Sequence, residues 1–328
     1  MQSVLAIEEA MDALSHILED IHLGKAEYTY ISGHGDWLVN VPQQSAVVFY
    51  VVTAGQVHVY LKDRTVLLEA GGILVIPSGA EHQVGCPNPE HSYALPKQLV
   101  QQDLSFARKE DLIFQVGVGL TQAVVLAVRS LFDIEMSRPL LSALPECFLL
   151  TSEADNSAPP WLKLGLEFLG LETERTRPGR DTLLNRLANM FFIECVRDYV
   201  EQLPEESESW LTALRDPTLM AALGAIHDQP AHPWSVADLA SIACMSRSSF
   251  AERFAEVIGQ PPLSYLSAHR LRLAARQLVQ SYESIARISE RVGYASEAAF
   301  SQAFKRQYDM SPSQYRKDAK AENSEHSL

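Results

Sequence analysis

One pattern of residues occurs twice near the C-terminal end of this 328-residue chain, shifted by 50 positions. The shift pairs chemically matching residues: Ser246 with Ser296, Phe250 with Phe300, Phe254 with Phe304, Pro262 with Pro312 and Tyr265 with Tyr315. A repeat that keeps a helix cap, two aromatic residues and a helix-opening proline indicates two copies of one supersecondary unit. The repeat therefore restricts residues 217–320 to a duplicated helical arrangement.

Each copy is predicted to contain two short helices joined by a tight turn. In the first copy Ser235 and Asp238 form a capping-box pattern, and Ser246 caps the next helix. In the second copy Gly293 permits the turn and Ser296 caps the helix that follows. Two such helices, the second exposing polar residues in its first turns, are typical of a helix-turn-helix that enters the major groove.

A continuous helical pattern separates the two copies. It covers residues 263–281 and its 19 residues would span about 28 Å. The second helix of each copy is called its reading helix below. Such a spacer can hold the two reading helices roughly one DNA turn, ~34 Å, apart.

Charge is unevenly distributed along the chain. The whole chain has 27 Lys and Arg against 41 Asp and Glu, but residues 231–320 contain 12 against 8. The acidic net charge therefore belongs to the front part, and the repeat itself is mildly basic.

Residues 217–318 resemble the C-terminal DNA-binding domain of the AraC/XylS transcription regulators. The second copy carries the family's most specific pattern in its Gly293-Tyr294 turn, its Phe304-Lys305-Arg306 stretch and its Ser311-Pro312 ending. Asp309 departs from it, because the family usually has glycine after this helix. The resemblance implies a sequence-specific regulator of transcription, more specifically an activator, with double-stranded DNA and RNA polymerase as partners.

The polar faces of the two second helices supply the candidate DNA contacts. We expect base contacts from Arg247, Ser248, Glu252, Ala298 and Gln302, and phosphate contacts from Lys305, Arg306 and Arg270. Arg253 lies nearer the apolar face, where packing or a local ion pair is expected instead.

The N-terminal part of the chain has a strand-like rather than a helical residue pattern. From Ala46 it reads as short β-branched strands punctuated by turn residues at spacings of about 8–10 residues, which predicts an all-β barrel or jelly roll. This part resembles the cupin sensor domain of many AraC-type regulators, in the subgroup related to RclR-type regulators. The predicted fold class is thus α+β in two domains, a cupin-like barrel followed by helices and an all-α double helix-turn-helix domain.

The expected domain limits are 1–203 for the sensor domain, 204–216 for a linker, 217–320 for the DNA-binding domain and 321–328 for a disordered tail. Residues 1–20 read as an amphipathic helix, and either Met1 or Met11 could be the start. Residues 112–128 are expected to form two buried strands and a turn rather than a membrane span.

The helical segment at 160–203 is a candidate homodimer surface. Its apolar stripe contains Leu184, Leu187, Phe191 and Cys195, beside Leu183, Met190 and Val196. Packing of this stripe against the barrel is the alternative interpretation.

A metal-dependent cupin enzyme with an appended regulatory domain is the alternative function, and a helical module that binds protein partners is a further one. Metal cupins generally supply three histidines and a glutamate, whereas here only His58 and His82 stand near the two expected motifs. We therefore predict no catalytic residue, no metal and no cofactor.

What the barrel senses is the open question. One candidate is a small apolar or amphipathic ligand inside the barrel, near Phe49, Val51, His58, Tyr60 and His82. The other is modification of a cysteine by an oxidant or electrophile, with Cys86 the best placed because a loop-like stretch follows it. Cys147, Cys195 and Cys244 lie in apolar patterns and are expected to be buried. With no disulfide pattern and no secretion signal, a cytoplasmic location is predicted.

Overall fold

The computed structural model describes residues 17, 26–86, 101–104, 113–150, 160–174, 178–204 and 210–325. Contacts divide the chain into two compact units. Residues 23–133 and 144–202 form one, called the sensor unit after its predicted role, and residues 134–143 and 203–328 belong to the other, called the C-terminal unit. Met1, Met11 and the amphipathic helix predicted for residues 1–20 lie outside the described residues, except Ile17. Among the described residues no helix is both long and apolar enough to cross a membrane.

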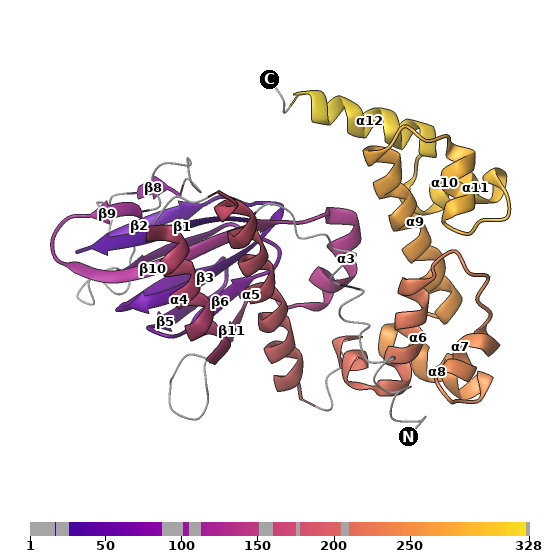
Figure 1. Cartoon of the computed structure of the whole chain (residues 1–328), viewed down its shortest axis with the longest axis horizontal. Helices are drawn as coiled ribbons and strands as arrows, with labels where there is room; N and C mark the ends of the chain where they lie inside the picture. Colours follow the sequence, from indigo (N-terminus) through magenta and orange to yellow (C-terminus); the bar gives the residue numbers. More distant parts are fainter. Residues whose placement is uncertain are drawn as a thin grey trace. The chain divides into compact units, whose positions relative to one another are not determined.

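Two β-sheets form the barrel of the sensor unit (Figure 1). Its first sheet runs in the order β11 (Phe148–Leu150), β6 (Ile73–Ile76), β3 (Ala46–Ala54), β10 (Thr121–Leu131), β1 (Ala26–His34) and β9 (Ile113–Gly117). The second runs in the order β5 (Thr65–Glu69), β4 (Gln56–Tyr60), β7 (His82–Cys86), β2 (Trp37–Val41) and β8 (Gln101–Asp103). The β-branched strands predicted from Ala46 onward are thus confirmed.

Alternation along the strands decides what fills the barrel. In β3, Val48, Tyr50 and Val52 belong to the inner core, which also holds Trp37 and Val84. Successive side chains of a strand point to opposite faces, so the residues between them face outward. The interior is therefore a packed apolar core.

The strands predicted within residues 112–128 form, but they do not pair with each other. Both β9 and β10 flank β1, β9 in parallel and β10 in antiparallel orientation. β10 is largely buried, whereas β9 exposes Ile113 and Gln115 because it lies at the edge of its sheet.

Two helices complete the sensor unit, α4 (Pro160–Glu174) and α5 (Arg180–Gln202). Helix α5 covers the first sheet: Phe191 packs edge-on against Phe49 of β3, with ring centroids 6.2 Å apart. Helix α4 approaches α5 closely at Gly165, where any Cβ would collide with the Phe191 ring. The helical segment expected at 160–203 is confirmed.

The C-terminal unit is helical. It contains η2 (Trp210–Arg215), α6 (Pro217–Asp228), α7 (Val236–Ile242), α8 (Arg247–Ile258), α9 (Pro262–Gln280), α10 (Ile285–Arg291), α11 (Glu297–Tyr308) and α12 (Pro312–Glu325). Asp216 caps α6 through bonds from the backbone amides of Thr218 and Leu219, with Pro217 in the first turn. An aspartate cap followed by proline at the first helical position is a local start signal for a helix.

The structure adds detail at three places within the expected domain limits. Residues 210–215, expected in a linker, form η2 and bury Leu211 and Ala213. Residues 321–325, expected in a disordered tail, continue α12. Helix α3 (Ile134–Ala143) lies within the range expected for the sensor domain, but its contacts group it with the C-terminal unit, where the Tyr308 hydroxyl donates to Glu135 at 3.1 Å.

Candidate functional site

The first helix-turn-helix consists of α7 and α8. Ser235 and Asp238 form the predicted capping box at the start of α7, and the Ser246 hydroxyl accepts from the Ser249 amide at the start of α8. Phe250 and Phe254 are fully buried. Burial of these two rings fixes which face of α8 remains exposed.

The turn of the first unit exposes two side chains. Ile242, at the end of α7, is 36% exposed. Cys244, expected to be buried, is exposed with φ +54. It occupies the left-handed position of the turn, which places its side chain outside the core.

The second unit repeats this construction in α10 and α11. Gly293 forms the turn with φ +86, and Ser296 accepts from the Ala299 amide to cap α11. Phe300 and Phe304 are fully buried, and Asp309 ends the helix with φ +58. Asp309 therefore adopts the left-handed conformation that glycine has in the related pattern.

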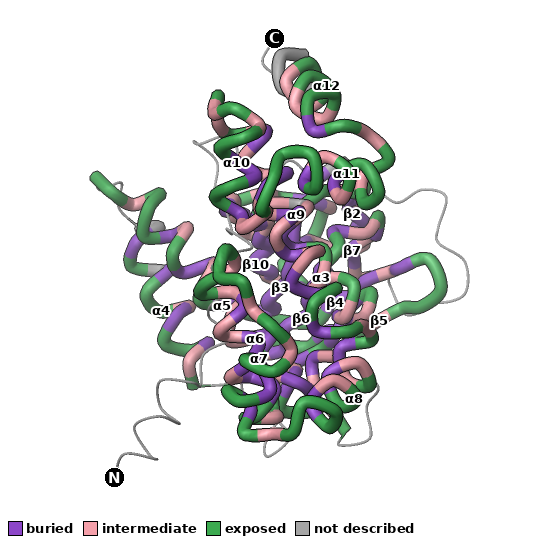
Figure 2. Tube along the Cα trace, turned by 90° about the vertical axis from the view of Figure 1, so that its right-hand side faces the viewer, coloured by how far each residue is buried: buried purple, intermediate pink, exposed green. Residues whose placement is uncertain are grey.

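The predicted contact residues occupy the exposed faces of α8 and α11. Arg247, Ser248 and Glu252 are exposed on α8, and Arg247 and Ser248 border a hollow of about 420 Å³ with Val236 and Ala251. On α11 the exposed residues include Ala298, Gln302, Lys305 and Arg306. Both pairs of helices lie on the same side of α9 (Figure 1), and Figure 2, which views that side, shows long exposed stretches on both reading helices.

Arg270 does not lie on either exposed face. Its guanidinium donates to three backbone carbonyls, those of Pro230, His232 and Gly293. Each of its three nitrogens thus already donates to the protein's own backbone, and the expected phosphate contact stays a prediction. Arg253 forms the expected local ion pair with Glu256 at 3.2 Å, and it also lies 3.8 Å from Asp216, the N-cap of α6.

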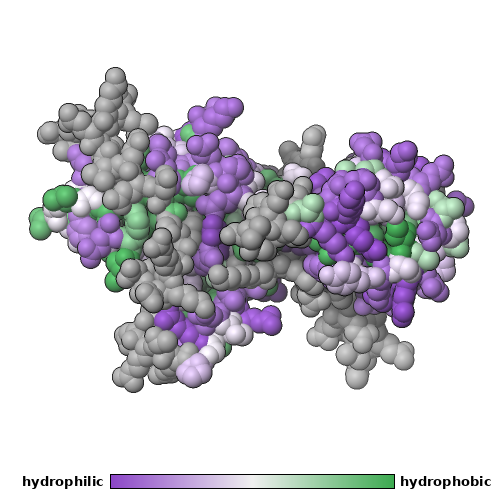
Figure 3. Space-filling model, turned by 90° about the horizontal axis from the view of Figure 1, so that it is seen from above, coloured by the Kyte–Doolittle hydropathy of each residue, from purple (hydrophilic) through white to green (hydrophobic). Residues whose placement is uncertain are grey.

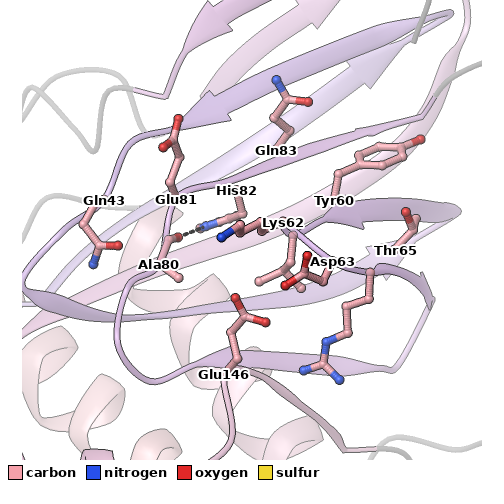
Figure 4. A pocket seen from close by; sticks show the side chains of 12 residues that line it. Gln43, Tyr60, Lys62, Asp63, Thr65, Ala80, Glu81, His82, Gln83 and Glu146 are labelled. Carbon is pink, nitrogen blue, oxygen red and sulfur yellow. Dashed lines mark hydrogen bonds between the residues drawn. The ribbon is translucent and has the colours of Figure 1, made fainter. Parts of the chain in front are cut away.

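An open pocket of about 850 Å³ lies at the rim of the barrel (Figure 4). Tyr60 and His82, two of the predicted sensing residues, line it, together with Lys62, Arg64 and Glu146. Its lining carries charges of both signs, which differs from the apolar interior site that was expected.

His82 is held at the floor of this pocket by two hydrogen bonds. Its Nδ1 lies 2.5 Å from the Ala80 carbonyl, and its Nε2 lies 2.7 Å from the Tyr50 hydroxyl. Burial lowers the pKa of His82 to about 4, although the bond to Ala80 acts in the opposite direction. The imidazole is consequently neutral at physiological pH, with Nδ1 donating to Ala80 and Nε2 accepting from Tyr50.

Phe49 and Val51 are not inside the barrel. They alternate with the inner residues of β3, and Phe49 contacts Phe191 of α5. The expectation for these two residues is wrong because it took the neighbouring apolar residues of one strand as facing the same way. His58 stacks on Tyr60, with ring centroids 6.0 Å apart.

The surroundings of the cysteines do not favour a reactive thiolate at Cys86. Cys86 is the last residue of β7, and burial, followed by nearby Asp36, raises the pKa of its thiol. Cys147 and Cys195 are buried, as predicted. Arg64 donates to the carbonyl oxygen and to Sγ of Cys147, at 2.7 and 2.6 Å. No cluster of three or more His, Cys, Asp or Glu side chains able to hold a metal ion occurs among the described residues.

The predicted apolar stripe of the helical segment is partly buried and partly exposed. Leu184, Leu187, Phe191 and Cys195 are buried within the sensor unit, so packing against the barrel accounts for them, whereas Leu183 and Met190 beside them are 44% and 41% exposed. Helix α4 also exposes Leu164 at 69%, Phe168 at 39% and Leu171 at 63%. Their spacing of four and three residues is visible in the sequence and could have identified this face. Apolar side chains are also exposed at the sensor end of Figure 3.

Comparison with known proteins covers both units. A cupin family model matches residues 12–201, and a helix-turn-helix domain model matches residues 239–318. The HTH-type transcriptional regulator AlkR of Acinetobacter baylyi is 42% identical over 310 residues, covering 94% of this chain and 100% of AlkR. The RCS-specific HTH-type transcriptional activator RclR of Escherichia coli is 37% identical over 55% of this chain and 63% of RclR. The DNA-binding domain of AdpA, solved in complex with a target DNA, is 32% identical over 31% of this chain and 91% of that chain, with a TM-score of 0.30.

Proposed function

This chain belongs to the AraC family of regulators that carry an N-terminal cupin domain, and on that premise we propose that it binds specific DNA sequences to regulate transcription. One observation carries the proposal: α8 and α11 are capped, anchored by buried phenylalanines and rich in exposed polar residues, and both lie on the same side of α9. Two helices presented in this way suit successive segments of one major-groove face.

The residue roles within the two helices follow from their position. Arg247, Ser248 and Glu252 on α8, and Ala298 and Gln302 on α11, would contact base edges, since the N-terminal turns of a reading helix enter the groove. Lys305 and Arg306 lie in the last turn of α11 and would contact phosphates.

Selection of bound sequences from random duplexes tests this function. We expect a defined site with two half-sites, and affinity that falls steeply as salt rises, because bound phosphates release counterions. Binding with no sequence preference at any salt concentration would contradict the proposal.

We propose that the protein activates transcription through RNA polymerase, because its relative RclR is a transcriptional activator. Transcription in a purified system, from a supercoiled template with and without the selected site, measures the direction of the effect. More transcript with the site than without it is the expected result.

Sensing by the barrel would use the rim pocket. Tyr60, Lys62 and Arg64 offer hydrogen-bond donors, while Glu146 lies on the side facing His82 (Figure 4). A polar or amphipathic small molecule suits this lining better than a fully apolar one. A compound library scanned for an increase in melting temperature, repeated with Tyr60→Ala, would identify ligands of the pocket.

A homodimer would form through α4. Leu164, Phe168 and Leu171 create a continuous exposed apolar stripe on one helix, which is uncommon for a surface that faces only water. Sedimentation at micromolar concentration measures this association, and a monomer would exclude it.

A further inference from the structure

A single side chain connects the two helix-turn-helix units. Nε of Arg270 donates to the Pro230 carbonyl at 2.6 Å, and Nη2 donates to the His232 carbonyl at 2.7 Å. Both carbonyls belong to the segment that leads into α7. Nη1 donates at 3.1 Å to the carbonyl of Gly293, in the turn between α10 and α11. One guanidinium therefore bonds to the backbone of both units at once.

The two backbones also meet at this place. A Cβ on Gly293 would lie 2.7 Å from both Cα and the carbonyl oxygen of Ala231. Only a glycine allows the turn of the second unit to approach the first this closely. The close contact and the three hydrogen bonds therefore define one joint, made of Arg270, Gly293 and residues 230–232.

The joint lies at the boundary between two separate cores. Tyr265 and Leu266 of α9 pack into the core of the first unit, whereas Leu271 and Leu278 pack into that of the second. Arg270 stands between these two groups on the same helix. Helix α9 is shared by both cores, and the joint adds direct backbone contacts between the two units at the point where one core ends and the other begins.

We propose that Arg270 is a positioning residue that fixes how the two reading helices are placed relative to each other, and thereby the half-site spacing that the protein accepts. This inference rests on the proposed function in DNA binding. The planar guanidinium suits the role because its donors have a fixed geometry, so three bonds hold two backbones in one arrangement. Lysine has one rotatable ammonium group on a flexible stem and cannot reproduce this arrangement.

The consequence concerns spacing rather than base identity. One extra base pair between the half-sites turns the second half-site by about 35° and moves it by about 3.4 Å. A rigidly joined pair of helices must lose contacts or deform the DNA to follow. A pair without the joint can follow with less loss.

The test compares duplexes that carry the selected site with duplexes in which one base pair is added or removed between the half-sites. For the full-length wild type we expect an affinity loss of about tenfold or more. For Arg270→Lys we expect that loss to shrink several-fold, with an unchanged salt slope. Arg316→Lys is the matched control, because Arg316 donates to the Leu278 and Glu283 carbonyls, both within the second unit. It should keep the full spacing penalty.

Three results would contradict these proposals. If Arg270→Lys lost as much affinity as the wild type when the spacing changes by one base pair, the inference would be overturned. A salt slope lowered by about one in Arg270→Met would assign Arg270 to a phosphate contact instead and overturn it too. Failure of the wild type to bind any duplex would overturn the proposed function itself.

A second measurement does not depend on the stability of a variant at Arg270. Spin labels at Glu256 and Gln307, both exposed, report the distance between α8 and α11 in a chain whose Cys86 and Cys244 are replaced by serine. We expect one narrow distance distribution that DNA does not change. A broad distribution in the absence of DNA would contradict a fixed joint.

Discussion

The Tyr50 hydroxyl and Nε2 of His82 lie 2.7 Å apart at the base of the rim pocket. Tyr50 is fully buried and burial raises the pKa of its hydroxyl, so it stays protonated and donates to the imidazole. His82 donates in turn to Ala80. The pair connects the pocket floor to the barrel core through a bond that requires the neutral form of histidine.

This arrangement predicts a loss of stability in acid. The pKa of His82 is about 4 in the folded state and about 6.5 in an unfolded chain. Between these values protons bind the unfolded chain preferentially, so the stability that neutral His82 gives the fold is complete above pH ~6.5 and is lost as the pH falls toward ~4. Between about pH 7 and about pH 5, we expect the free energy of unfolding of the wild type to fall by about 2 kcal/mol more than that of His82→Gln. Denaturant unfolding at the two pH values measures it. Equal losses in both proteins would contradict the prediction.

Arg247 and Lys305 should affect DNA binding differently. Arg247→Ala should cost about 1–3 kcal/mol of binding free energy and relax the preference at one base position, because a groove-facing arginine reads a base edge. Repeating the duplex selection measures both effects. An Arg247→Ala protein with unchanged sequence preference would refute the base-reading role.

Lys305→Ala should weaken binding to all sequences alike and lower the salt slope by about one, because a phosphate contact carries no sequence information. Arg197→Ala is the control for a change of charge, since Arg197 pairs with Glu194 on α5 in the sensor unit. It should leave affinity and salt slope unchanged.

The helix-turn-helix units could be predicted because their signals are local. A serine cap, a turn residue and two phenylalanines four positions apart determine each reading helix within about a dozen residues, and all of them occur in the sequence. Asp309 could be assigned to a left-handed cap for the same reason.

Several other features depend on partners that lie far away in the sequence. Arg270 bonds to a carbonyl 40 positions earlier, and no local pattern indicates that a cationic side chain turns inward. The buried stripe of α5 and the exposed stripe of α4 have similar spacing, and only the packing of Phe191 on Phe49 decides which of the two faces the barrel. Helix α3 joins the C-terminal unit through Tyr308, which is 173 positions from Glu135.

Phe168→Glu should dissociate the dimer proposed for α4. A carboxylate in the centre of the stripe would have to lose its hydration on association, so we expect monomers at micromolar concentration where the wild type forms dimers. Val118→Glu is the matched control, because Val118 is 87% exposed in the same unit but lies in the turn between β9 and β10. Dissociation by both variants, or by neither, would count against α4 as the interface.

Gly293→Ala and Gly259→Ala separate backbone strain from close packing. Both glycines have left-handed φ values, +86 and +79, so an alanine at either position should cost about 1–2 kcal/mol through strain alone. A Cβ on Gly259 would meet nothing within 4 Å, whereas a Cβ on Gly293 would collide with the Ala231 backbone.

We therefore expect Gly293→Ala to lower the free energy of unfolding of the C-terminal unit by about 1–3 kcal/mol more than Gly259→Ala does, since the backbone at the joint must shift to admit the methyl group. Unfolding by denaturant, followed through tryptophan fluorescence in a chain whose Trp37 and Trp161 are replaced by phenylalanine, measures the difference. Trp210 and Trp234 pack against the core of the first unit, so their signals report on the C-terminal unit. Equal losses would mean that the close contact of Gly293 with Ala231 relaxes without cost, and that the turn needs glycine only for its backbone conformation.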